Sequence, residues 1–104
     1  MDALHIPDAN DPYAYELLSE DDQRFLLHWI AENLRPIQRF NPKRRSYEIK
    51  HWIEEEYPDR YFTNGEFKGA MVTAGYKVQD PNADNWVFNV SEESPYLAKK
   101  KAQI

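Results

Sequence analysis

Two short helical patterns, joined by a tight connection and followed by two strand-like patterns, constrain the fold more than any other feature of this chain. The first helical pattern opens at Ser46 and stops before Pro58, and the second opens at Thr63 and stops at Gly75. Proline stops a helix because the residue before it avoids the α conformation, and glycine readily takes the left-handed conformation that ends one. This order predicts a helix-turn-helix followed by a wing.

A further helical pattern precedes this pair and predicts the main core helix. It opens at Ser19, which has capping-box spacing to Asp22, and it stops before Pro36. Its apolar residues recur at helical spacing. They are Phe25, Leu26, Trp29, Ile30 and Leu34. We expect no regular structure before Ser19.

The helix that opens at Thr63 has one face suited to burial and an opposite face without bulk. The first face is formed by Phe67, Ala70, Met71 and Ala74. The second carries Gly65 and Gly69, and a glycine inside a helix costs roughly 1 kcal/mol relative to alanine. We therefore expect another backbone to approach this face closely, either from within the fold or from a partner.

The remaining patterns complete the expected fold. Residues 76–79 and 86–90 show strand patterns, and the turn-rich segment 80–85 separates them. We predict an α+β fold of the winged helix-turn-helix type, in which three helices precede a C-terminal two-stranded β-hairpin, the wing.

Length and composition point to one domain, and the lack of cysteine is compatible with a reducing compartment. The 104 residues suit a single unit. We expect an N-terminal arm at 1–18, the winged-helix-like domain at 19–90 and a flexible basic C-terminal tail at 91–104.

The chain has no cysteine, which excludes disulfides and thiolate metal sites. Neither a secretory leader nor a membrane-spanning stretch is expected, so we predict a cytoplasmic protein.

The sequence does not predict an enzyme. None of the three histidines lies near a nucleophile signature, and there is no glycine loop of the kind that cradles phosphate. Three consecutive glutamates, Glu54, Glu55 and Glu56, lie in a predicted helix, where successive side chains point about 100° apart and do not converge on a metal. We expect no metal and no cofactor.

The charge is unevenly distributed along the chain. The net charge is −5, which by itself disfavours a polyanion as partner. Residues 1–22 contain seven acids and no Lys or Arg, whereas residues 35–50 contain six basic residues and the single acid Glu48. The positive charge therefore gathers in the segment that leads into the helix at Ser46.

Double-stranded DNA is the first predicted partner. In a winged helix-turn-helix, the helix that opens at Thr63 would enter the major groove while the basic segment contacts phosphates. The candidate base-edge residues are Asn64, Lys68 and Thr73. The candidate phosphate contacts are Arg39, Lys43, Arg44, Arg45, Lys50 and Lys77. Against this hypothesis, Asp80 and Asp84 at the wing tip would repel phosphates.

Four stretches of the chain resemble a group of small phage proteins. They are residues 45–51, 63–71, 74–76 and 85–86. The pattern is similar to SYGLKH, TNGxFKGAMxxAGY and NW in small uncharacterised winged-helix-like proteins of phages and integrative elements of Gram-positive bacteria. This chain has Glu48 and Ile49 where that group often has Gly-Leu. The resemblance covers about residues 41–90 and implies a mobile-element origin in a bacterial host cell, but supplies no site residues. We expect a DNA-binding protein of such an element to be regulatory.

An acidic protein-binding module is the alternative. Small acidic phage proteins often act on host machinery, and an acidic surface can imitate DNA in front of the basic groove of a defence nuclease, as in anti-CRISPR or DNA-mimic proteins. The candidate contact residues are Asp21, Asp22, Glu54, Glu55, Glu56, Asp80 and Asp84. A structural role in the virion is a third candidate, and the sequence does not indicate an oligomeric state.

Overall fold

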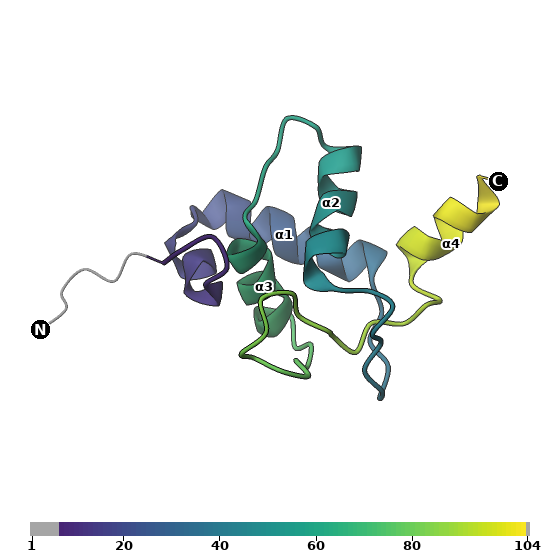
Figure 1. Cartoon of the computed structure of the whole chain (residues 1–104). Coiled ribbons are helices and arrows are strands. Elements are labelled where there is room, and N and C mark those ends of the chain that lie inside the picture. Colours follow the sequence, from purple (N-terminus) through teal and green to yellow (C-terminus); the bar gives the residue numbers. More distant parts are fainter. Residues whose placement is uncertain (1–6, 104) are drawn as a thin grey trace, which may run out of the picture.

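The computed structural model describes residues 7–103 and is mostly helical in this part of the chain. Five helices follow one another (Figure 1): the 3₁₀ helix η1 (Pro12–Leu17), α1 (Glu20–Asn33), α2 (Ser46–Glu56), α3 (Asn64–Thr73) and α4 (Pro95–Ala102). Residues 1–6 of the expected arm lie outside the described residues. The expectation of no regular structure before Ser19 is wrong, because residues 12–17 form η1, whose first turn is capped by the Asp11 side chain. None of the helices in residues 7–103 is long and apolar enough to cross a membrane.

The local start and stop signals place α1 and α3 as predicted. The Ser19 hydroxyl accepts a hydrogen bond from the Asp22 amide at 3.1 Å. Thr63 and Glu66 form a complete capping box, with each side chain accepting from the backbone amide of the other. Gly75 follows the end of α3 with a φ of 98°, the left-handed conformation expected of a glycine after a helix.

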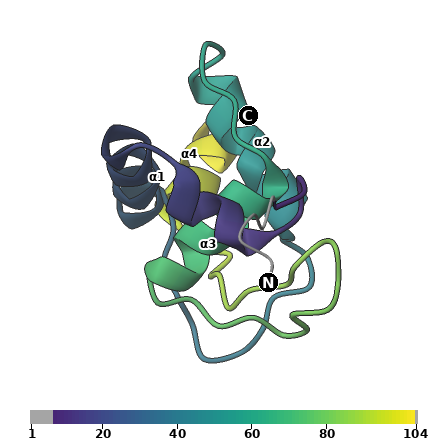
Figure 2. The same cartoon turned by 90° about the vertical axis from the view of Figure 1, so that its left-hand side faces the viewer.

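The core lies where α3 packs against α1, α2 and η1 (Figures 1 and 2). The side chains that fill it come from all three α-helices and from the 86–90 segment, and they are nearly inaccessible to water. The most buried are Leu26, Ile30, Ile49, Ile53, Phe67, Met71, Phe88 and Val90. The apolar faces predicted for α1 and α3 therefore contribute to the core, except that Ala74 is exposed and Phe25 is only partly buried.

The predicted wing is wrong, because residues 7–103 contain no β-strand and only isolated bridges. Val78 pairs with Phe88 in one such bridge, and the 86–90 segment makes two others to residues 36 and 45. All five residues of the 86–90 segment are buried. The 86–90 segment lies between segments 36–45 and 76–79. The Asn89 side chain makes hydrogen bonds to both of them, in place of some of the backbone hydrogen bonds that a hairpin would form.

The last segment forms a helix where the sequence suggested a flexible tail. Pro95 occupies the first turn of α4, as its fixed φ favours. The Tyr96 ring is buried and stacks on Trp52, with ring centres 4.6 Å apart and planes 12° apart. Leu97 is also buried. Two buried side chains, Tyr96 and Leu97, thus help to hold a stretch of otherwise charged sequence on the domain.

The face of α3 that carries Gly65 and Gly69 is covered by η1 of the same chain, which crosses this face in Figure 2. A Cβ atom added at Gly65 would overlap the backbone of Asp11, and one added at Gly69 would overlap Pro12 and Tyr15. Glycine is needed at both positions because two backbones meet there. The sequence allowed the approaching backbone to come from within the fold or from a partner. In the described residues it comes from within the fold, from η1.

Candidate nucleic-acid interface

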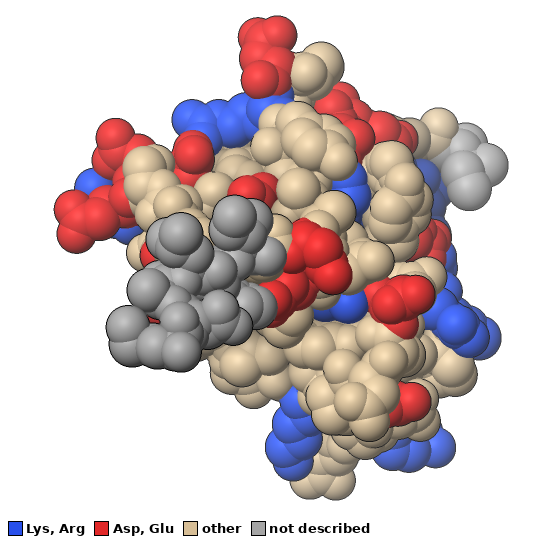
Figure 3. All heavy atoms as spheres, turned by 60° about the vertical axis from the view of Figure 1, so that its left-hand side comes forward, with Lys and Arg blue, Asp and Glu red and all other residues tan. Residues whose placement is uncertain are grey.

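Four exposed cations lie on the segments at one end of the molecule. We call them the basic loop surface: Arg39, Lys43, Arg45 and Lys77. Within residues 7–103, none of them forms an ion pair. The loops that carry them form the lower end of the molecule in Figure 1, and basic side chains also gather at the lower end of the surface in Figure 3.

Asn89 joins the two segments that carry these cations. Its side-chain amide nitrogen donates to the carbonyl of Ile37 at 2.8 Å, and its side-chain oxygen accepts from the amide of Lys77 at 2.8 Å. The backbone of Ile37 also donates to the carbonyl of Asn89 at 2.9 Å. Lys77 is therefore held beside the loop between α1 and α2, although the two are far apart in sequence.

Asn41 anchors the same loop from inside. The buried amide nitrogen of its side chain donates to the carbonyl of Val90 at 2.9 Å and to Glu92 at 2.7 Å. Its side-chain oxygen accepts from the amide of Lys43 at 3.1 Å. No sequence pattern identifies Asn41 or Asn89 as site residues, because the Asn-Pro pair at 41–42 indicates only a loop.

Arg44 and Lys50, two of the predicted phosphate contacts, interact with acids of the chain itself. Arg44 donates two hydrogen bonds to Glu92, at 2.9 and 3.0 Å, and one to Glu48 at 3.2 Å. These bonds raise the pKa of Arg44 and lower that of Glu92. Lys50 is 2% exposed and pairs with Glu54. Their role in the described structure is to position the surrounding elements.

Two of the predicted base-edge residues face the interior. Asn64 donates to the side chain of Asn10 at 3.0 Å and to the carbonyl of Asp84 at 2.9 Å. Lys68 is 2% exposed, donates to the carbonyl of Asn10 at 3.1 Å, and has its pKa lowered by burial. Thr73 is exposed and donates to the carbonyl of Gly69. In this arrangement α3 does not present Asn64 or Lys68 to a groove.

Five of the seven acids of the alternative site form ion pairs within the chain. Asp21 pairs with Arg24, Asp22 with Arg60, Glu54 with Lys50, Glu55 with Lys100, and Glu56 with Lys99. Burial raises the pKa of Glu56, but hydrogen bonds from Lys99 and Trp29 outweigh it and leave that pKa below its usual value. Asp80 and Asp84 are exposed and lie in the loop between 79 and 85, apart from α1 and α2 along the chain.

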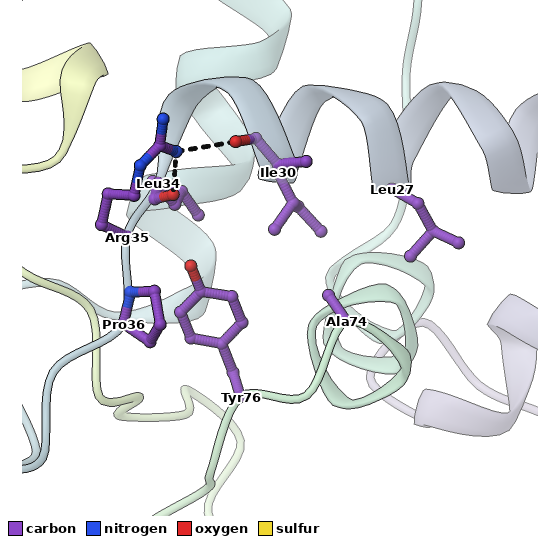
Figure 4. A pocket seen from close by; sticks show the side chains of 8 residues that line it. Leu27, Ile30, Leu34, Arg35, Pro36, Ala74 and Tyr76 are labelled. Atoms are coloured by element: carbon purple, nitrogen blue, oxygen red, sulfur yellow. Dashed lines mark hydrogen bonds between the residues drawn. The ribbon is translucent and has the colours of Figure 1, made fainter.

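A groove of about 350 Å³ lies between α1 and the end of α3 (Figure 4). Its walls are mainly apolar, and the ring of Tyr76 closes one side. Arg35 is the only charged residue in the lining, and its guanidinium donates to the carbonyls of Ala31 and Leu34 at 2.7 Å each. The residues that line this groove include no nucleophile paired with a base.

The described residues contain no group of three or more side chains that could hold a metal ion. Comparison with protein-family models, with curated proteins and with solved structures finds no match for this chain. The arguments about function therefore depend on the placement of charges and rings in residues 7–103.

Proposed function

We propose that this protein binds double-stranded DNA through the basic loop surface, by contacts to phosphates. The supporting observation is that Arg39, Lys43, Arg45 and Lys77 are exposed and form no ion pair in the described part of the chain, whereas most of the candidate acids do. Cations that are free of internal partners can replace the counterions that surround DNA. The resemblance of residues 41–90 to mobile-element proteins suggests a phage or integrative element as the origin of this protein, and we propose a regulatory role for its DNA binding there.

The expected binding is weak in sequence preference and strong in salt dependence. The backbone of α3 and its residues Asn64 and Lys68 are covered by the segment 8–18, so the contacts that remain are to phosphates. Phosphate contacts fix position without reading bases. Four such contacts give a slope of about −3.6 in log affinity against log salt, which is a loss on the order of a hundredfold between 50 and 200 mM salt.

Fluorescence anisotropy of a labelled random duplex, at low and at moderate salt, tests this function. Arg39→Glu/Lys43→Glu is expected to abolish binding, because it replaces two phosphate contacts with two repelling charges. Arg24→Glu/Lys101→Glu changes the net charge equally at exposed positions outside the basic loop surface and is expected to bind nearly as well as the wild type. A flat titration of the wild type at low salt would overturn the proposal.

Equal losses in the two double variants would also contradict the proposed surface, because they would show that only net charge matters. A flat duplex titration would favour the alternative, an acidic module that binds a basic host protein. In that case Asp80 and Asp84 are the acids to change first, because both are exposed and neither forms an ion pair in residues 7–103.

A further inference from the structure

We propose that the protein also binds single-stranded nucleic acid, with unpaired bases stacking on two exposed tyrosines beside the basic loop surface. We call Tyr47 and Tyr61 the tyrosine platform. This inference rests on the proposed function, because the phosphates of the strand would be held by the same cations. It adds a class of ligand and a second set of contact residues to that function.

The two rings are exposed although they are large and partly apolar. Tyr61 is 70% exposed and Tyr47 is 52% exposed, the first and third largest values among the exposed large hydrophobic residues. Residues of this size in water mark an interaction surface when they gather in one place. Tyrosine also suits such a surface because its ring can stack while its hydroxyl stays hydrated.

The side chain of Lys50 holds the platform together from below. Its ammonium nitrogen lies 5.3 Å from the centre of the Tyr47 ring and 4.6 Å from that of Tyr61. Both rings therefore border one buried cation, although they come from α2 and from the loop that precedes α3. Cation–π attraction of this kind favours fixed ring positions. His51 packs edge-on against Tyr47 at 4.6 Å between centres.

The positive charge of Lys50 beneath the two rings is compensated by a carboxylate. The tyrosine platform is therefore better suited to neutral bases than to phosphates. Lys50 forms an ion pair with Glu54, and Glu54 also lies 3.4 Å from His51. An uncompensated lysine here would favour a phosphate, and an uncompensated glutamate would repel the strand. The platform thus offers ring faces with little net field, next to a surface with unpaired positive charge.

The platform and the basic loop surface are joined by the start of α2. Arg45 is exposed and lies two residues before Tyr47, and its backbone bridges to Val87. The amide of Tyr47 donates to the Asn85 side chain at 3.0 Å, and that of Ser46 donates to the carbonyl of Trp86 at 2.8 Å. These bonds fix the first turn of α2 against 85–87, so a strand can pass from Arg45 onto Tyr47.

The rings discriminate between single and double strands for a physical reason. In a duplex the bases stack on each other and present only their edges, whereas in a single strand each base has a free face. Stacking on a protein aromatic ring stabilises a bound single strand and depends little on sequence. The platform should therefore strengthen the binding of single strands and leave the binding of duplexes nearly unchanged.

The test is anisotropy with a labelled random single strand and with the matching duplex, for the wild type and for Tyr47→Ala/Tyr61→Ala. We expect the double variant to lose about tenfold or more in single-strand affinity and to change little in duplex affinity. Tyr47→Phe/Tyr61→Phe keeps both rings and should bind like the wild type. Tyr13→Ala/Tyr57→Ala, which removes two other exposed tyrosines, is the matched control.

The outcomes separate this inference from the proposed function. If the alanine pair binds single strands as well as the wild type does, while the duplex is still bound, the platform is overturned and the proposed function stands. If the wild type binds neither nucleic acid at low salt, both fall. Tyr61→Ala alone, in a loop, gives a second test if the double variant unfolds: an unchanged single-strand affinity would again reject the platform.

Discussion

Asn41 is a buried amide in a loop that is otherwise exposed. It uses both side-chain polar atoms, donating to the carbonyl of Val90 and to Glu92 and accepting from the backbone of Lys43. Its own backbone amide donates to Phe88 at 2.9 Å. A buried group that satisfies several partners is costly to remove because those partners are left without hydrogen bonds. The position of the loop that carries Arg39, Lys43 and Arg45 therefore depends in part on an uncharged residue.

Replacing Asn41 should show this dependence. We expect Asn41→Ala to lower the free energy of unfolding by about 2–3 kcal/mol, from the lost hydrogen bonds and the partners left unpaired. Urea denaturation followed by tryptophan fluorescence measures it. Gln38→Ala, at an exposed position in the same loop, should change the value by no more than about 0.5 kcal/mol. Similar values for the two variants would contradict the assigned role.

The residue scale also shows what the sequence could and could not predict about the site. Arg39, Lys43, Arg45 and Lys77 are exposed, as expected of isolated cations in loops. Lys50 has an acid at the i+4 position, Glu54, and this spacing is a signal for the pair that the structure shows. The partners of Arg44 and Lys68, Glu92 and Asn10, are 48 and 58 residues away, so no local pattern reveals them.

At the scale of elements, local sequence signals correctly predicted the helices whose ends they determine. Caps, prolines and a glycine predicted α1, α2 and α3, because each acts within a few residues. The hairpin failed because strands need a partner, and here Asn89 binds the neighbouring segments through its side chain. The helix α4 was missed because its stability comes from Tyr96 on Trp52, a contact between distant residues.

The contact between η1 and α3 gives a prediction at this scale. Gly69→Ala should raise helix propensity by about 1 kcal/mol, yet we expect a net loss of about 1–3 kcal/mol in unfolding free energy because the new methyl group overlaps Pro12 and Tyr15. Urea denaturation measures the change, and limited proteolysis should cut residues 7–18 faster. Val72→Ala on the exposed side of α3 is the control.

An increase in stability on Gly69→Ala would have a clear meaning. It would show that the gain in helix propensity is realised without a clash, and therefore that η1 does not lie on α3 in solution. The cover over Asn64 and Lys68 would then be absent, and α3 would again be available as a recognition helix.

At the scale of the whole molecule, two carboxylates tie the C-terminal segment to the rest of the fold. Glu92 binds Arg44 before α2, and Glu56 at the end of α2 binds Lys99 of α4. The hydrogen bond from Arg44 is the largest influence on Glu92 and lowers its pKa; for Glu56, the bonds from Lys99 and Trp29 exceed the effect of burial and lower the pKa as well. Both groups thus favour the folded state when they are ionised.

The sign of the pH dependence follows from these directions. A carboxylate with a lowered pKa in the folded protein stabilises it above the usual value of 4.5, and this contribution disappears as the pH falls through the lowered pKa. We expect stability to fall steadily as the pH is lowered from about 5, and the near-ultraviolet circular dichroism of the Trp52–Tyr96 pair to weaken with it. Glu92→Gln/Glu56→Gln should flatten the dependence of unfolding free energy on pH. The control is Glu16→Gln/Glu20→Gln, which should leave this dependence unchanged, because both positions are exposed and neither forms an ion pair in residues 7–103. An equally steep dependence in the first double variant would place the acid sensitivity elsewhere and reject these two ion pairs as the attachment of α4.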